Sequence, residues 1–240
     1  MKPGTRWKIA AALTLVLILL GARVGLSLQS RNEEAAARIV PLSHVNTGLP
    51  VVGLMVDVSQ ARPEQIQAAL LVLGSLQMKG TWFVDATTVE SQPALMKDIA
   101  SKGHELGLRG TDDKPIDRLS RAEVKDRVLR SRQALAKVGI EPVPFLFPPL
   151  GRFSDTVITV ALQEGCQAVK PVYDASVMRG KEDAAAAKIA NAVMPGDILV
   201  AKVGKSGILP EQRYLAALVG SLKERGLALA PLSDLVKGVK

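Results

Sequence analysis

The sequence has few cysteine, histidine and aromatic residues, and each shortage argues against a class of function. Its 240 residues include one cysteine, Cys166, so no internal disulfide can form. Only 3% of the residues are aromatic, which argues against a well-developed cleft that stacks sugar rings. The two histidines, His44 and His104, are too few for a usual catalytic zinc site, which takes about three ligands, mostly His or Cys.

The charge is positive but not concentrated. The formal net charge is +8, and residues 1–28 hold four basic residues and no acid, so residues 29–240 carry 8 − 4 = +4. Apolar residues make up 48% and charged residues 22%, which is typical of a globular chain. No arginine-rich cluster with interleaved aromatic residues is present, so nucleic acid is not an expected partner.

Residues 1–28 have the pattern of a membrane segment. Three basic residues precede an uncharged run at residues 9–22, which extends to residue 28 if Arg23 snorkels. At 1.5 Å per residue that run covers about 30 Å, the thickness of a bilayer core. No clear cleavage site follows, so we favour an uncleaved signal anchor over a cleaved signal peptide. The expected protein crosses the cell membrane once, with its N-terminus in the cytoplasm and its domain outside.

The rest of the chain divides into a stem and one domain. Residues 29–50 are polar, then mixed, and we interpret them as a stem in which His44 is solvated. Residues 51–240 alternate apolar runs with amphipathic ones, and the capping box Ser120-x-x-Glu123 predicts a helix start. This alternation predicts an α/β fold with a parallel sheet, closed as a distorted (β/α) barrel. Strands are expected at residues 51–58, 81–85, 105–109, 143–147, 166–170, 197–203 and 227–230.

Functional side chains of such folds gather at the carboxyl ends of the strands. These ends are expected at residues 57–59, 85, 109–113, 147–151 and 202–204. Cys166 begins a strand among apolar neighbours, so we interpret it as a buried structural thiol and not as a nucleophile.

Five stretches over residues 51–236 resemble, in order, the NodB-homology domain of polysaccharide deacetylases (carbohydrate esterase family 4). They are VVGLMVDVSQ, GTWFVDATTVESQPALMKDIASKGHELGLRG, PFLFPPLGRFSD, GDILVAKV and LAPLSDLV. Active members of that family remove acetyl groups from N-acetylated sugars. The resemblance implies a divalent metal, often zinc, held by one Asp and two His, with a second Asp as base and a third His as acid.

Most of those functional positions differ in this chain. The resemblance places the base at Asp57, which is retained. It places the ligand Asp at Val58, the two ligand histidines at Arg109 and Asp113, and the acid histidine at Lys202. The expected protein therefore has no metal and no cofactor.

The remaining cleft positions are also altered. The resemblance places the motif arginine at Phe147 and the motif tyrosine at Leu150, beside Pro148 and Pro149. An all-oxygen ion site formed by Asp57, Asp112 and Asp113 is disfavoured, because Arg109 in the same loop would repel a cation. We expect Arg109 to approach Asp57 or Asp113 instead, and the alternative that these are only solvated loop charges stays open.

Two functions follow from these residues. The first is a membrane-anchored, catalytically inactive protein of the cell envelope that binds a cell-wall glycan or an envelope protein. It would be similar to the deacetylase-like proteins of sporulation and wall maturation in Gram-positive bacteria. The alternative is an active hydrolase of amide C–N bonds in the N-acetylated amino sugars of peptidoglycan or chitin-like polymers. The histidine count favours the first.

Overall fold

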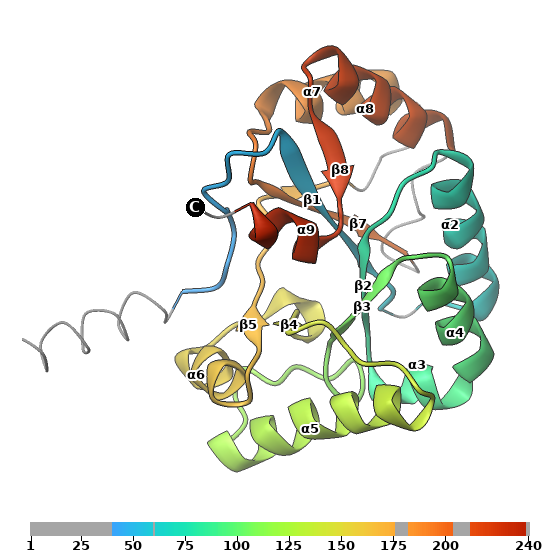
Figure 1. Cartoon of the computed structure of the whole chain (residues 1–240). Coiled ribbons are helices and arrows are strands. Elements are labelled where there is room, and N and C mark those ends of the chain that lie inside the picture. The colour runs from blue at the N-terminus through green and yellow to red at the C-terminus, as the bar shows by residue number, and fades with distance from the viewer. Residues whose placement is uncertain (1–39, 60, 176–181, 204–211, 239–240) are drawn as a thin grey trace, which may run out of the picture. The chain divides into compact units, whose positions relative to one another are not determined.

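A computed structural model of the chain describes residues 40–59, 61–175, 182–203 and 212–238 (Figure 1). The chain separates into two compact units, Met1–Val40 and Pro41–Lys240. The expected membrane anchor at residues 1–28 and most of the expected stem lie outside the described residues. Within the described part, no helix combines the length and apolar character that crossing a membrane requires.

The second unit is the expected α/β fold, built on an eight-stranded parallel sheet. The strand order is β5-β4-β3-β2-β1-β7-β6, and β8 pairs with the first residues of β1. In this order β5 and β6 form the two ends, so the sheet is a half-barrel. The strands are β1 (Val51–Asp57), β2 (Thr81–Val84), β3 (Glu105–Leu108), β4 (Phe145–Leu146), β5 (Gln167–Ala168), β6 (Tyr173–Asp174), β7 (Ile198–Lys202) and β8 (Ala228–Ala230).

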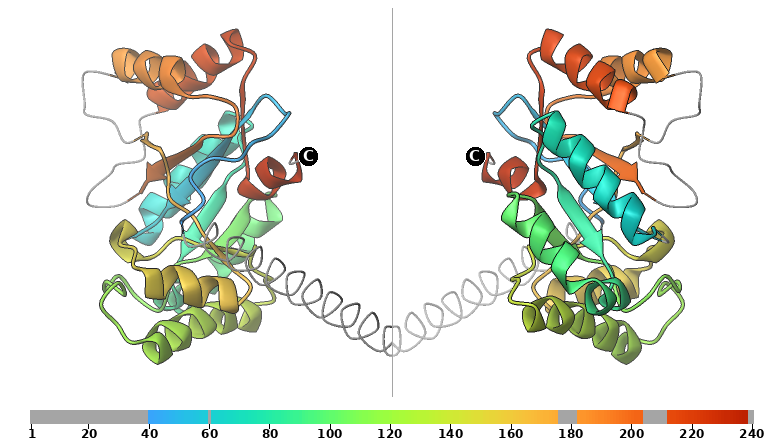
Figure 2. Two further views of the ribbon diagram at one scale, coloured as in Figure 1. Left: turned by 90° about the vertical axis from the view of Figure 1, so that its left-hand side faces the viewer. Right: turned by 90° about the vertical axis from the view of Figure 1, so that its right-hand side faces the viewer.

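Helices α2 to α8 connect the strands and cover the outer face of the sheet, whereas α9 packs on the inner face. In both figures α7 and α8 lie side by side, as do α5 and α6 (Figures 1 and 2). The helices are α2 (Pro63–Ser75), α3 (Ala86–Ser91), α4 (Pro93–Ser101), α5 (Arg121–Lys137), α6 (Asp155–Gln163), α7 (Glu182–Ala192), α8 (Gln212–Glu224) and α9 (Leu232–Lys237), with a 3-10 turn at η1 (Pro149–Gly151).

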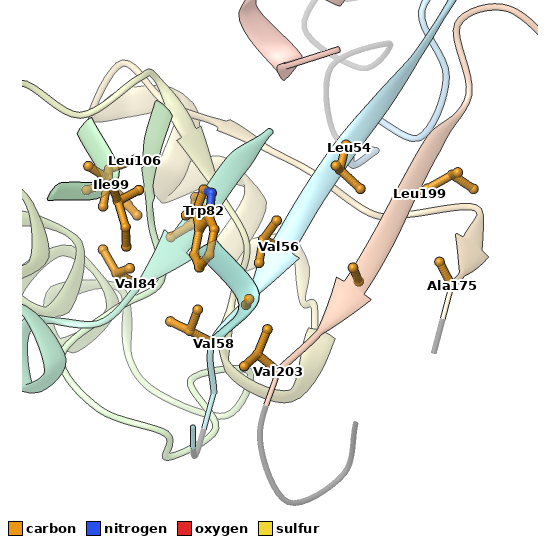
Figure 3. Close-up of a cluster of buried hydrophobic side chains, with 14 of the residues drawn as sticks. Leu54, Val56, Val58, Trp82, Val84, Ile99, Leu106, Ala175, Leu199 and Val203 are labelled. Carbon is orange, nitrogen blue, oxygen red and sulfur yellow. The ribbon is translucent and has the colours of Figure 1, made fainter. Parts of the chain in front are cut away.

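Two apolar clusters line the two faces of the sheet. The outer cluster lies between the strands and the helices and contains Leu54, Val56 and Val58 of the β1 segment (Figure 3). The inner cluster contains Met55 of β1, Phe83 of β2 and the two apolar residues that α9 contributes. Side chains alternate along a strand, so Leu54 and Val56 join the outer cluster and Met55, which lies between them, joins the inner one.

The beginning of the domain differs from the expectation. Residues 41–50 were expected to belong to the stem, but Leu42 pairs with Val169, and Val45 is buried in the inner cluster. His44 pairs with Asp197, and its ring Nδ1 lies 2.9 Å from the Asp197 carboxylate. His44 is exposed, as expected, but it belongs to the domain and not to a stem, because it pairs with a residue 153 positions away.

The segment after β2 forms two short helices, α3 and α4, which are separated at Gln92. Asp85 caps α3, because its side chain accepts the Thr88 backbone N–H at 2.8 Å. Pro93 starts α4, since its missing N–H and fixed φ suit a first helical turn.

Candidate functional site

Four polar side chains reach the inner face of the sheet at the carboxyl ends of neighbouring strands. The alternation of β1, β2, β3 and β7 carries Asp57, Asp85, Arg109 and Lys202 to that face. Asp57 and Lys202 are register partners across β1 and β7. Phe83 of β2 pairs with Gly107 of β3. Asp85 and Arg109 each follow two residues later, so their side chains come together at the ends of these strands.

Arg109 is the centre of this group and is fully buried. Its Nε lies 3.2 Å from Oδ1 of Asp57, and its Nη1 lies 3.7 Å from Oδ2 of Asp85. The same Nη1 donates a hydrogen bond to Oδ1 of Asp113. The expectation that Arg109 approaches Asp57 or Asp113 is confirmed for both, and Asp85 is a third partner that the sequence interpretation missed.

The carboxylates around Arg109 are also held by their own neighbours. Oδ1 of Asp57 accepts the Ser59 backbone N–H, and Oδ2 accepts the Ser59 hydroxyl, each at 3.0 Å. Asp85 accepts the backbone N–H and the hydroxyl of Thr88 at 2.8 and 3.0 Å. Burial raises the pKa of the Asp85 carboxyl, and the Thr88 hydrogen bonds and the charge of Arg109 oppose that shift. These oxygens are therefore occupied by protein donors.

The loop that follows β3, residues 109–113, is also held by contacts with α5 and α3. Nη1 of Arg127 in α5 lies 2.8 Å from the Asp112 carboxylate and 3.2 Å from the Thr111 hydroxyl. The backbone N–H groups of Ala86 and Thr87 donate to the carbonyl groups of residues 110 and 111. Asp112 thus pairs with Arg127 of α5, whereas Asp113 pairs with Arg109. The two acids that were expected in the cleft therefore have different partners.

The residues present do not fit a divalent metal. The positive guanidinium of Arg109 lies among the three carboxylates, where it would repel a cation. Val58, at the position of the ligand aspartate, is buried in the outer apolar cluster and offers no ligand atom (Figure 3). Across the described ranges, no three His, Cys, Asp or Glu side chains come together in a group that could hold a metal ion.

A cavity of about 370 Å³ opens beside the Arg109 group. It lies toward β6 and β7, and of the residues expected in the cleft it includes Asp57, Phe147, Leu150 and Lys202. Its lining residues are Asp57, Ser59, Phe147, Leu150, Gly151, Phe153, Lys170, Pro171, Val172, Tyr173, Asp174, Val200 and Lys202.

The cavity is bounded by a second ion pair. Nζ of Lys202 donates to Oδ2 of Asp174 in β6, whereas its register partner Asp57 faces Arg109. Pro148 and Pro149 were also expected in the cleft, but both are buried and neither lines the cavity.

Three residues of this region were given no role by the sequence interpretation, although two of them, Ser59 and Asp85, stand at expected strand ends. Asp85 carried a signal, because it ends the apolar stretch TWFVD and therefore stands at a strand end. Asp174 and Ser59 carried a weaker one, since their roles depend on the side chains that β6 and β1 bring close to them. Cys166 is buried, as expected, and burial raises the pKa of its thiol, which is unfavourable for a nucleophile.

A comparison with known families matches residues 44–169 to the polysaccharide deacetylase family. The chain is 25% identical over 203 residues to the uncharacterized protein YlxY of Bacillus subtilis (strain 168), covering 82% of this chain and 60% of that protein. It is 26% identical over 177 residues to a chitooligosaccharide deacetylase of Bradyrhizobium sp. (strain ANU 289), covering 68% of this chain and 81% of the relative. The chain thus spans 60% of the length of the Bacillus protein that it matches.

Among solved structures, the chain is similar to wild-type BA3943 of Bacillus anthracis, a pseudoenzyme of carbohydrate esterase family 4. The TM-score is 0.73 at 20% sequence identity, and the match covers 84% of this chain and 70% of that chain. At this identity the likeness concerns the fold alone.

Proposed function

The chain belongs to the polysaccharide deacetylase family, and we propose that it is a catalytically inactive member that binds a glycan or a protein partner at the cell envelope. The observation that carries this proposal is the burial of Arg109 among Asp57, Asp85 and Asp113. Deacetylation in the family uses a metal to activate water. Here the guanidinium of Arg109 lies among three carboxylates, at a position that the resemblance gives to a ligand histidine, and its charge would oppose a metal ion there.

The chemistry of Asp57 and Lys202 supports the same proposal. Both oxygens of Asp57 accept hydrogen bonds from Ser59, and Oδ1 also faces the guanidinium of Arg109, which competes with a substrate water for this carboxylate. Lys202 stands where the family has its acid and pairs with Asp174. The fold relative BA3943, described as a pseudoenzyme, gives a precedent for this fold without activity.

The alternative function is hydrolysis of the amide C–N bond in N-acetylated amino sugars of peptidoglycan or chitin-like polymers. The retained Asp57 and the chitooligosaccharide deacetylase among the relatives favour it. It requires Arg109 to leave its three carboxylates before a metal could enter, which would leave buried acidic groups without a partner.

We further propose that residues 1–28 anchor the protein in the cell membrane with its domain outside. The basic residues before the apolar run and the missing cleavage site support this. Cell fractionation tests it: we expect the intact N-terminus in the membrane fraction. A soluble form that begins between residues 22 and 29 would contradict the anchor, although not the binding function.

Binding is tested with the full-length protein in detergent, in the presence of EDTA. We expect it to sediment with purified peptidoglycan or to retain an envelope protein that elutes specifically. The variant Lys202→Gln changes the cavity, and Lys97→Gln on the exposed face of α4 is its matched control. If both variants bind as the unmodified protein does, the cleft is not the binding site.

A further inference from the structure

One side of the cavity is formed by the short segment that joins the two end strands of the sheet. Residues 169–172 follow β5 and lead directly into β6, and these two strands are the ends of the half-barrel. All of these residues except Val169 line the cavity. We call residues 169–172 the wall, and the shape of the cavity depends on the contacts that hold it.

Only part of the wall is held by the sheet itself. The N–H groups of Val169 and Val172 donate to carbonyl groups of β4 and β7 at 2.9 and 2.8 Å. Pro171 has no N–H group to donate. The N–H group of Lys170 donates at 2.8 Å to the carbonyl group of Leu42, which lies well before β1 in the sequence. The wall is therefore also held by the segment that precedes the first strand.

Leu42 belongs to a strap, which we define as residues 41–45, that runs from the end of β5 to the start of β7. The Leu42 N–H donates to the last carbonyl group of β5 at 2.8 Å, so Leu42 pairs beside β5 as a parallel strand residue would. At the other end of the strap, His44 pairs with Asp197, directly before β7. The side chain of Val45 is buried in the inner apolar cluster.

The end of the strap at β7 fits closely against Gly196. The Val45 N–H donates to the Gly196 carbonyl group at 2.9 Å, and a Cβ on Gly196 would overlap the Val45 carbonyl oxygen. The φ of Gly196 is 92°, which glycine adopts without strain. A side chain at this position would therefore displace the strap.

We propose that the strap controls the shape of the cleft. The docked strap holds the wall at the cavity, and the wall moves when the strap detaches. A segment held by few contacts can open locally while the rest of a domain stays folded. The inference rests on the proposed binding function and deepens it, because it concerns the regulation of the same cleft: a ligand that contacts the wall would favour the docked strap.

Hydrogen–deuterium exchange of the full-length protein in detergent tests the inference without any ligand. Val45→Ala removes buried apolar surface from the strap, so peptides that cover the strap and the wall should both exchange about tenfold faster. Peptides of β3 should exchange as in the unmodified protein. The matched control is Val128→Ala, since Val128 of α5 is also buried but lies in the outer cluster, and it should leave the exchange of the wall unchanged.

A second pair of variants tests the same contact from the side of the sheet. Gly196→Ala should speed the exchange of the strap and the wall by tenfold or more, because the new methyl group displaces the Val45 carbonyl group. Its control is Gly139→Ala. Gly139 has a φ of 79°, so the backbone strain is similar, but a Cβ there meets no atom within 4 Å. This control should leave the strap and the wall unchanged.

The inference is overturned if the strap peptides exchange faster in Val45→Ala and Gly196→Ala while the wall peptides do not. It is also overturned if neither changes, or if every peptide exchanges faster, since the strap would then open only with the whole domain. None of these results depends on binding or on acetate release. A failure of the proposed function, which is read from sedimentation with peptidoglycan and from product formation, is therefore distinguishable from a failure of this inference.

Discussion

Nε of Arg109 lies 3.2 Å from Oδ1 of Asp57, and 0% and 5% of the two side chains are exposed. The two residues end neighbouring parts of the sheet, on β3 and β1, with Asp85 between them at the end of β2. A buried ion pair of this kind does not by itself make a protein more stable than apolar packing would, but breaking it leaves a charge without a partner.

Replacing Arg109 by Met is therefore expected to lower the free energy of unfolding by about 3 kcal/mol, because Asp57 and Asp85 would remain buried beside each other. The control is Arg130→Met, since Arg130 pairs with Asp126 at 65% exposure and should contribute less than about 0.5 kcal/mol. Urea denaturation measures both. Equal, small losses in the two variants would show that the Arg109 group is solvated and not structural.

Acid should destabilise the domain through His104. Burial, together with the charge of Lys79, lowers the pKa of His104 from 6.5 to about 4. Between pH 6.5 and pH 4, His104 is therefore protonated in the unfolded chain and neutral in the folded chain. The contribution of His104 to stability is complete above pH 6.5 and declines as the pH falls through this window.

The variant His104→Asn isolates that effect. The Asn Oδ1 can accept the Gly80 backbone N–H, which now donates to His104 Nδ1 at 3.2 Å, and Asn does not titrate. Urea midpoints at several pH values should fall less steeply in the variant than in the unmodified protein. Parallel midpoint curves would mean that folding does not shift the pKa of His104.

Glycine substitutions test the packing of the inner face. A Cβ at Gly107 would lie 2.7 Å from the Phe83 ring, so Gly107→Ala should lower the free energy of unfolding by about 1–3 kcal/mol. A Cβ at Gly74 in α2 meets no atom within 4 Å, so Gly74→Ala should raise it by about 0.5–1 kcal/mol. Thermal denaturation of the two variants is the measurement, and an unchanged or higher melting temperature of Gly107→Ala would contradict the close contact at Phe83.

Local signals in the sequence predicted much of the fold. Ser120 and Glu123 form the capping box that starts α5, with the Ser120 backbone N–H donating to Glu123 Oε2 at 2.8 Å. The Val-rich run of residues 51–58 became β1, since a run apolar on both faces suits a strand covered on both sides. The pairing of Arg109 was predictable because an arginine and several acids end adjacent strands.

Features that depend on distant contacts were not predictable. β4, β5 and β6 are two residues long, and their neighbours in the sheet, not their own residues, define them. The pairing of Lys202 with Asp174 follows from the register of β6 and β7, and the pairing of His44 with Asp197 follows from the path of the chain before β1. Neither has a local sequence signal.

The most direct test of the proposed inactivity is acetate release from chitooligosaccharides and from purified peptidoglycan. The unmodified protein is first treated with EDTA and dialysed, and then assayed alone, with Zn²⁺ and with Co²⁺. We expect acetate at the level of the protein-free control in every case, because Arg109 occupies the space among Asp57, Asp85 and Asp113. Acetate release that appears on adding metal and disappears with EDTA would contradict the proposal.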